Sequence, residues 1–250
     1  MPKVIAFAEG VALTGASAQV WVAAAVTVVF TAFARLVKGV SSSGAIAGAL
    51  VCFLLYVGAG PGAFVALVSV FALTWLATRL GYQRKQALGT AEKREGRTAS
   101  QVLANLAVAA ACCGLYGNGR NAIFLLAAAA ALSEAAADTV SSELGQAWSD
   151  RARLITNWQV VPAGTDGGVT WLGSCTGWAA AALVSWLCVL VGLLPTRWLA
   201  ASLLGAVAGT IADSYLGALL ERRKLLNNDW VNFLSTLIAA AVACGLARIS

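Results

Sequence analysis

The stretch AIFLLAAAAALSEAAADTVSSELG, residues 122–145, decides the fold because it begins as a membrane span and ends in acids and hydroxyls. Its apolar run, 122–132, holds 11 residues, about 16 Å of helix against a hydrocarbon core of roughly 30 Å. This run is too short to cross a bilayer by itself. Either the helix takes Glu134 and Asp138 into the membrane, or it ends partway and its polar end faces a wet cavity.

The composition places the whole chain in a membrane. Of the 250 residues, 60% are hydrophobic and 11% are charged, and the mean hydropathy is +0.79; an average soluble protein has about a quarter of its residues charged. Apolar runs recur along the whole length, so spans and short connections leave no room for a soluble domain of ordinary size. We therefore expect a single integral membrane domain over residues 1–250, built as an all-α bundle.

Eight apolar segments predict eight transmembrane helices, with seven as the alternative count. These segments are 18–34, 44–60, 63–77, 102–116, 121–140, 169–194, 198–220 and 230–247. The segments 63–77 and 102–116 are short for a span, which indicates local thinning of the bilayer or flanking polar helix. The apolar segment 4–11 is too short to span and lacks the features of a signal peptide, so we expect it at the membrane interface.

The basic residues indicate the orientation. With the N-terminus on one face and alternating spans, four of the 17 Lys and Arg residues fall on that face and thirteen on the other. By the positive-inside rule the second face is cytoplasmic and both termini lie outside. Three polar segments, 81–105, 154–173 and 212–232, also fall on this face. We expect the active site there, at what we take to be a prokaryotic inner membrane.

The acids of residues 122–145 form a pattern on the helix. At 100° per residue, Glu134, Asp138, Ser141 and Ser142 share one stripe, whereas Glu143 points the opposite way unless the helix unwinds. A charged carboxylate near the helix centre costs roughly 2.5–3.5 kcal/mol, so such residues usually face a cavity, a partner or a metal. The alternative for Glu134 is a solvated helix end with pairing to an interior donor.

A second span also carries an acid within its apolar sequence, because Asp213 interrupts the segment 198–220. Both helices run toward the cytoplasm in this topology, so Asp138 and Asp213 approach that face from the same direction. Converging carboxylates repel unless a cation lies between them, and hard oxygen ligands suit Mg²⁺. We therefore predict a magnesium site of Asp138, Asp213 and Glu143, with a Lys or Arg partner as the alternative. The chain has no His, which excludes a His-ligated metal and His catalysis.

Two connecting segments carry anion-binding chemistry. In VPAGTDGGV, residues 161–169, the glycines at 164, 167 and 168 permit positive φ and close approach of backbone N–H groups to an anion. Thr165 is a further donor and Asp166 a metal ligand or turn-former. The alternative is a tight turn between helices, because the segment lacks the P-loop pattern.

The second segment is the basic loop 81–105. For Arg84 and Lys85 we expect contact with anionic lipid headgroups. Lys93 and Arg97 instead precede a polar helix start, where Gln101 and Asn105 lie on one side. A cationic loop above two amides suits a nucleotide.

The polar start of the last helix allows two interpretations. Asp229 precedes the apolar run as an N-cap would. Alternatively, Asp229 and Asn232 complete a nucleotide pocket.

Five ordered motifs carry a family resemblance. They are GR followed by QVLAN (96–105), ADTVSSELG (137–145), RLIT followed by VPAGTDGGV (153–169), ADSYLGA (212–218) and LNNDWVN (226–232). With them the chain resembles the membrane protein family that contains transmembrane protein 19 and the plant phytyl-phosphate kinase. Asp166 stands where many relatives carry Asn, and Glu134 lies outside the family pattern, so the resemblance leaves the roles of both open.

The resemblance implies transfer of a phosphoryl group from a nucleoside triphosphate, CTP being favoured, to an isoprenyl monophosphate. The expected catalytic residues are Asp138, Asp213, Lys93, Arg97 and Arg153. The residues expected to bind the nucleotide are Gln101, Asn105, Gly164, Thr165, Asp166, Gly167, Gly168, Ser214, Asp229 and Asn232. Mg²⁺ is the expected cofactor.

The expected partners are the isoprenyl substrate, the nucleotide and membrane lipid, with no nucleic acid; the oligomeric state stays open. A kinase for an isoprenoid alcohol and an ion-coupled transporter are the alternative functions. A transporter would require acids that are accessible from both faces. A scaffold protein would leave Asp138 and Asp213 without compensation.

Overall fold

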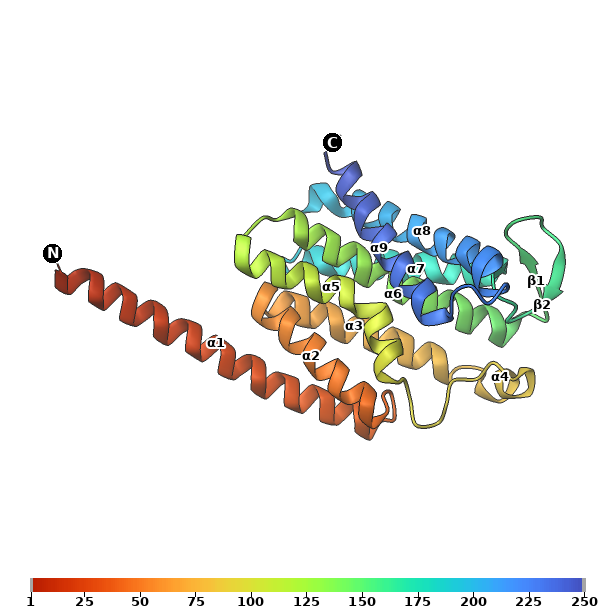
Figure 1. Cartoon of the computed structure of the whole chain (residues 1–250), viewed down its shortest axis with the longest axis horizontal. Helices are drawn as coiled ribbons and strands as arrows, with labels where there is room; N and C mark the ends of the chain where they lie inside the picture. Colours follow the sequence, from red (N-terminus) through yellow and green to blue (C-terminus); the bar gives the residue numbers. More distant parts are fainter. Residues whose placement is uncertain (1, 249–250) are drawn as a thin grey trace.

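The computed structural model describes residues 2–248, with side chains from residue 18 onward, and shows a bundle of long helices (Figure 1). Eight of the described helices are long and apolar enough to cross a membrane. They are α1 (Pro2–Leu36), α2 (Ser42–Ala59), α3 (Pro61–Arg79), α5 (Ala99–Gly119), α6 (Ile123–Trp148), α7 (Trp171–Leu190), α8 (Leu199–Leu216) and α9 (Asn228–Leu246). The predicted polytopic all-α bundle is confirmed. The interfacial placement expected for segment 4–11 concerns side chains outside the described ones.

Most of the short elements lie at one end of the bundle; the 3-10 helix before α8 lies at the other end, near the connection between α2 and α3 (Figure 1). Helix α4 (Tyr82–Leu88) follows α3, the 3-10 helix η1 (Thr196–Trp198) precedes α8, and the π-helix η2 (Gly217–Glu221) follows it. Figure 1 shows α4 and the strands β1 and β2 together at the end opposite the N-terminus. The distribution of basic residues predicts that this end faces the cytoplasm.

The connection between α6 and α7 folds into a small sheet that the sequence did not predict. Strand β1 (Arg151–Leu154) pairs antiparallel with both β2 (Val160–Pro162) and β3 (Gly168–Val169), in the order β2-β1-β3. The VPAGTDGGV segment is therefore more than a turn between helices. It crosses from one edge strand to the other around β1.

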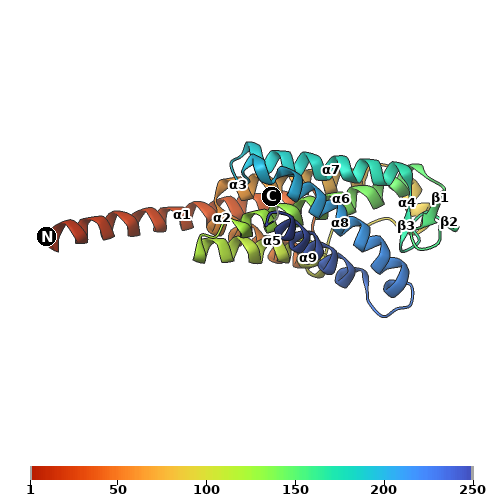
Figure 2. The same cartoon turned by 90° about the horizontal axis from the view of Figure 1, so that it is seen from above.

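Helix α6 is the centre of the bundle. Its apolar window is 83% buried, whereas the other spans are 17–39% buried. It packs against α3, α5, α7, α8 and α9, and Figure 2 shows it enclosed among its neighbours. The alanines 127–131 are all buried and let these neighbours approach closely. The helix continues unbroken to Trp148, so it carries Glu134 and Asp138 inside protein rather than into lipid.

Small residues set the helix contacts elsewhere as well. A Cβ atom added at Gly58 of α2 would lie 2.2 Å from the Cys113 carbonyl oxygen of α5. Between α6, α7 and α8, the Ser185 hydroxyl bonds to Ser133 at 2.8 Å and to Ser202 at 2.9 Å. Close backbone packing and buried hydroxyl pairs are the usual adhesive between membrane helices.

We expect Gly58→Ala to lower the free energy of unfolding by about 1–3 kcal/mol, because the added methyl overpacks the α2–α5 contact. Gly114→Ala in α5 is the matched control, since a Cβ there meets no atom within 4 Å and both changes gain the same helix propensity. Thermal unfolding midpoints in detergent measure the difference. Equal midpoints for the two variants would contradict the close approach.

Candidate functional site at the polar end of the bundle

A cavity of about 1290 Å³ opens at the polar end of the bundle, among α5, α6, α7, α8 and the small sheet. It gathers most of the residues predicted from the sequence. Those in its lining are Arg97, Gln101, Asn105, Asp138, Glu143, Arg153, Gly164, Thr165, Asp166, Gly167, Gly168, Asp213, Ser214 and Asn232. Lys93 lines a neighbouring cavity instead, and Asp229 lies in the first turn of α9.

Asp138 of α6 and Asp213 of α8 lie side by side in this cavity. Glu134 lies one helical turn deeper, close to Asp138, and the Ser235 hydroxyl of α9 lies beside both Glu134 and Asp213. Two buried oxygens of this group, Glu134 Oε1 and Asp213 Oδ2, have no hydrogen-bond partner in the described residues. A buried carboxylate oxygen without a partner is costly, so the cluster requires positive charge or protons.

Part of that positive charge comes from Arg97. Its guanidinium lies close to Asp138 and donates a hydrogen bond to Thr139 Oγ1 at 3.2 Å. Among the described residues Arg97 forms no ion pair with Asp138, so the arginine partner considered for Asp138 is a nearby charge and not a direct contact. It does not engage Asp213, whose Oδ2 stays free.

The donor set also fits Mg²⁺ in its chemistry. Both carboxylates are hard oxygen ligands, and Mg²⁺ is usually held by one or two carboxylates together with substrate phosphates and water. No group of three His, Cys, Asp or Glu side chains in the described part of the chain is arranged as a preformed metal site. The donor set available to a divalent cation is therefore the pair of carboxylates from α6 and α8.

Glu143 also lines the cavity, but its carboxylate oxygens bind groups of α3 and α4. Because α6 stays helical, its carboxylate accepts a hydrogen bond from Thr78 Oγ1 at 3.1 Å and forms an ion pair with Lys85. Both oxygens are thus engaged, and we restrict the metal proposal to Asp138 and Asp213.

The headgroup role expected for Lys85 is wrong. Its side chain is fully buried and also donates to the Ala77 and Thr78 carbonyls at 3.1 and 2.8 Å. Lys85 thereby ties α4 to the C-terminal end of α3 and to α6. Arg84 differs, since it pairs with the exposed Asp150 at the surface.

The glycine-rich segment 164–168 presses against the π-helix η2. Gly164 and Gly167 have φ of +86° and +72°, and a Cβ at Gly167 would lie 2.4 Å from Ala218 Cβ. The Thr165 amide and hydroxyl both donate to the Pro162 carbonyl, and the Gly168 amide donates to the Thr165 carbonyl. Both hydrogen-bond donors of Thr165 are therefore already used within the loop. Single π-turns occur frequently at functional sites, and this one places the segment beside Asp213.

The amides of α5 lie on one side, as predicted, but they also stabilise the helix start. Gln101 Oε1 accepts from the Thr98 amide at 2.8 Å in a capping box, and its Nε2 donates to Glu92 at 3.1 Å. Asn105 Nδ2 donates to the Gln101 carbonyl at 2.9 Å. The capping box holds Gln101 in place at the rim of the cavity.

The predicted N-cap of the last helix is wrong by two residues. Asn227 caps α9, since its side chain accepts from the Trp230 amide at 3.0 Å. Asp229 lies in the first turn, where an acid is favourable beside the helix dipole. Asn232 is buried and lines the cavity.

Three further residues at this end were missed by the sequence analysis. Glu221 lines the cavity at the end of η2, close to Asp166 and Asp138. Glu92 lines this cavity and its neighbour, and Lys38 lines only the neighbour. The sequence could have indicated Glu221, because an acid at the end of an apolar span is a candidate for a polar site. Glu92 and Lys38 sit in loops where charge is ordinary.

Eight apolar helices around a carboxylate-lined cavity define an integral membrane protein with a polar site at one end. The chain belongs to the family described as integral membrane protein DUF92, whose model matches residues 25–240. No solved structure has a significant match to it.

Three relatives extend the comparison. Uncharacterized membrane protein MJ0933 of Methanocaldococcus jannaschii is 33% identical over 206 residues, which cover 80% of this chain and 83% of the relative. Uncharacterized membrane protein sll0875 of Synechocystis sp. is 32% identical and covers 77% of each chain. Protein VTE6, chloroplastic, of Arabidopsis thaliana is 28% identical over 217 residues, 83% of this chain and 65% of the plant protein.

We expect Lys85→Met to lower the free energy of unfolding by about 3–5 kcal/mol, because it leaves the Glu143 carboxylate without its cation. Arg84→Met is the control, since an exposed pair of this kind contributes at most about 1 kcal/mol. Chemical unfolding in detergent compares the variants. The double change Lys85→Met with Glu143→Gln should recover part of the loss, and no recovery would contradict a direct ion pair.

Proposed function

We propose that the protein transfers the terminal phosphoryl group of a nucleoside triphosphate to an isoprenyl monophosphate at the cytoplasmic face of the membrane. The observation that carries this proposal is the pairing of Asp138 and Asp213 in one cavity with Arg97, Arg153 and the segment 164–168. The five motifs that resemble the phytyl-phosphate kinase family and the similarity to VTE6 support it.

Phosphoryl transfer needs charge neutralisation and alignment more than covalent help from the protein. Asp138 and Asp213 would hold Mg²⁺, which supplies positive charge to the triphosphate oxygens. Arg97, from the loop before α5, and Arg153, from β1, would bind further phosphate oxygens. Gln101, Asn105, Ser214 and Asn232 are the polar groups left for the base and ribose of the nucleotide.

The reaction balances without a general base. An oxygen of the isoprenyl monophosphate attacks the γ-phosphorus, the bond from that phosphorus to the β,γ-bridging oxygen breaks, and a nucleoside diphosphate leaves with the electron pair. The acceptor phosphate is already largely ionised at neutral pH. The residues therefore have to bind, orient and exclude water, and the described cavity offers carboxylates and arginines for this purpose.

The finer parts of the proposal come from the resemblance. CTP is the proposed donor and Mg²⁺ the proposed cofactor. The proposed location is a prokaryotic inner membrane, although VTE6 is named as chloroplastic.

We expect Asp138→Asn and Asp213→Asn each to reduce transfer at least about 100-fold, because each removes a carboxylate ligand of the proposed Mg²⁺, whose positive charge would neutralise the phosphates. The measurement is transfer of radiolabel from each γ-labelled nucleoside triphosphate to farnesyl, geranylgeranyl and phytyl monophosphates by purified protein with Mg²⁺. Asp150→Asn is the control, since Asp150 is an exposed acid at the same end of the bundle. Diphosphate formed at the wild-type rate by both site variants would refute the proposal.

We expect Gly167→Ala to reduce transfer about tenfold or more, because its methyl collides with Ala218 and displaces the segment from the phosphates. Gly192→Ala separates this collision from backbone strain. Gly192 also has a φ of +72°, but a Cβ there meets no atom within 4 Å. The same transfer assay applies, and equal losses in both variants would contradict a role for the contact with η2.

A further inference from the structure

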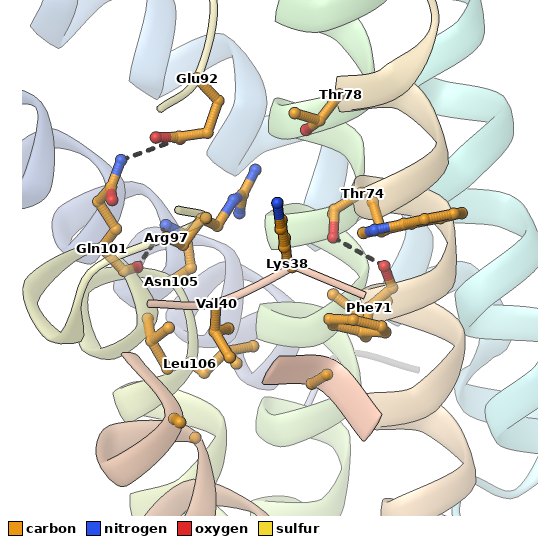
Figure 3. A pocket seen from close by; sticks show the side chains of 18 of the residues that line it. Lys38, Val40, Phe71, Thr74, Thr78, Glu92, Arg97, Gln101, Asn105 and Leu106 are labelled. Atoms are coloured by element: carbon orange, nitrogen blue, oxygen red, sulfur yellow. Dashed lines mark hydrogen bonds between the residues drawn. The ribbon is translucent and has the colours of Figure 1, made fainter. Parts of the chain in front are cut away.

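A second cavity, of about 450 Å³, lies beside the carboxylate cavity among α1, α2, α3 and α5. Figure 3 shows its two parts. Val40, Phe71 and Leu106 form an apolar wall, and the side chains of Lys38 and Arg97 point toward the space above them. We call this space the apolar chamber. Its volume is at the lower end of the range for small-molecule sites, about 300–1,000 Å³.

The two cavities meet at a common wall. Glu92, Arg97, Gln101 and Asn105 line both of them. A molecule in the apolar chamber therefore reaches the same arginine as a molecule beside Asp138. A polar molecule in one cavity and a molecule with an apolar chain in the other can approach each other there, and each remains in its own cavity.

The backbone around Arg97 is fixed against the turn between α1 and α2. The Ser41 amide donates to the Arg97 carbonyl at 2.9 Å, and the Arg97 amide donates to the Gly39 carbonyl at 3.2 Å. Gly44 makes this approach possible, since a Cβ there would lie 2.0 Å from the Arg97 carbonyl oxygen. The side chain is held in turn by Thr139. Arg97 is thus held in place as part of the wall between the two cavities, unlike a mobile cation at the surface.

The mouth of the apolar chamber is strongly cationic. Lys38, Arg79, Lys93, Arg94 and Arg97 line it, against the single acid Glu92. Arg79 is occupied by the Val37 carbonyl and the Trp75 ring. Lys38 takes part in neither ion pair found among the described residues, and its φ of +56° is rare for a side-chain-bearing residue. Lys38 is exposed, and a cation available beside an apolar wall matches an amphiphile with an anionic head.

We propose that the apolar chamber is the acceptor site, which binds the isoprenyl chain along α2 and α3 and its phosphate between Lys38 and Arg97. This inference rests on the proposed function and extends it to the place where the acceptor binds. The ligand is a phosphomonoester of a single chain, because one chain fits the volume and the mouth offers several cations to one head. The nucleotide occupies the larger polar cavity, and Arg97 contacts the phosphates of both.

Gly48 provides a direct test of chain binding. It lines the apolar chamber from α2, and a Cβ there meets no atom within 4 Å. Gly48→Leu therefore fills the chamber without a backbone collision. Gly114→Leu is the matched control, since it adds the same side chain to an equally open position of α5 that is outside the lining.

The first experiment measures binding of radiolabelled farnesyl monophosphate to detergent-purified protein without nucleotide, so that no transfer takes place. Lys38→Ala should weaken this binding about tenfold, the usual size of a lost charge-assisted contact. Unlabelled farnesol and inorganic phosphate should each compete poorly, since each offers half of the ligand. Competition by phosphatidic acid equal to that by farnesyl monophosphate would overturn the proposal in favour of a phospholipid headgroup site.

The second experiment measures KM for geranyl, farnesyl and geranylgeranyl monophosphates. Gly48→Leu should raise KM for the longest chain about tenfold relative to the shortest, with KM for the nucleotide unchanged and Gly114→Leu behaving as wild type. Transfer with an unaltered chain-length profile in Gly48→Leu and unaltered binding in Lys38→Ala would overturn the acceptor site and leave the proposed function intact. Binding that responds to both changes in a protein without transfer activity would refute the function and retain the site.

Discussion

The contact between the carboxylates of Asp138 and Asp213 is the constraint on which the rest of the polar site depends. Two acids held together inside a bundle repel each other, and the cost rises as water is removed. The surrounding elements offset that repulsion. Arg97 reaches Asp138 from the loop before α5, and the Ser235 hydroxyl lies beside Asp213 from α9. Asp213 Oδ2 is nevertheless left without a partner among the described residues.

The bundle can hold these acids because most of α6 is buried among other helices and does not face lipid. Its alanines allow five other helices to surround it, and glycines on the neighbours make room for its polar side chains. A Cβ at Gly209 of α8 would lie 2.6 Å from Glu134 Cγ. The acids of α6 are thus surrounded by protein and not by hydrocarbon, which lowers the cost of carrying them within a membrane. The same packing that stabilises the fold positions the chemistry.

The polar end also separates two environments across one residue. On one side of Arg97 lie carboxylates, amides and the glycine-rich segment; on the other lie aromatic and aliphatic side chains under a cationic mouth. Glycines at 39, 44 and 96 permit the close backbone contacts that hold Arg97 in place. An enzyme that joins a water-soluble anion to a lipid anion requires such a boundary. Each substrate then keeps its preferred solvent until the phosphates meet.

The sequence by itself determined the eight spans and the convergence of Asp138 and Asp213, because hydrophobicity and helical periodicity are local properties of the chain. It also gathered the glycine-rich segment and the basic loop at one end. Only the tertiary structure decided the pairs between distant residues. Lys85 meets Glu143 across 58 positions, and β1 pairs with two strands that follow it in the chain. The glycine-rich segment packs against η2, and Lys38 joins Arg97 in the apolar chamber. No local pattern encodes such partners, since loops and helix ends are placed by what they pack against.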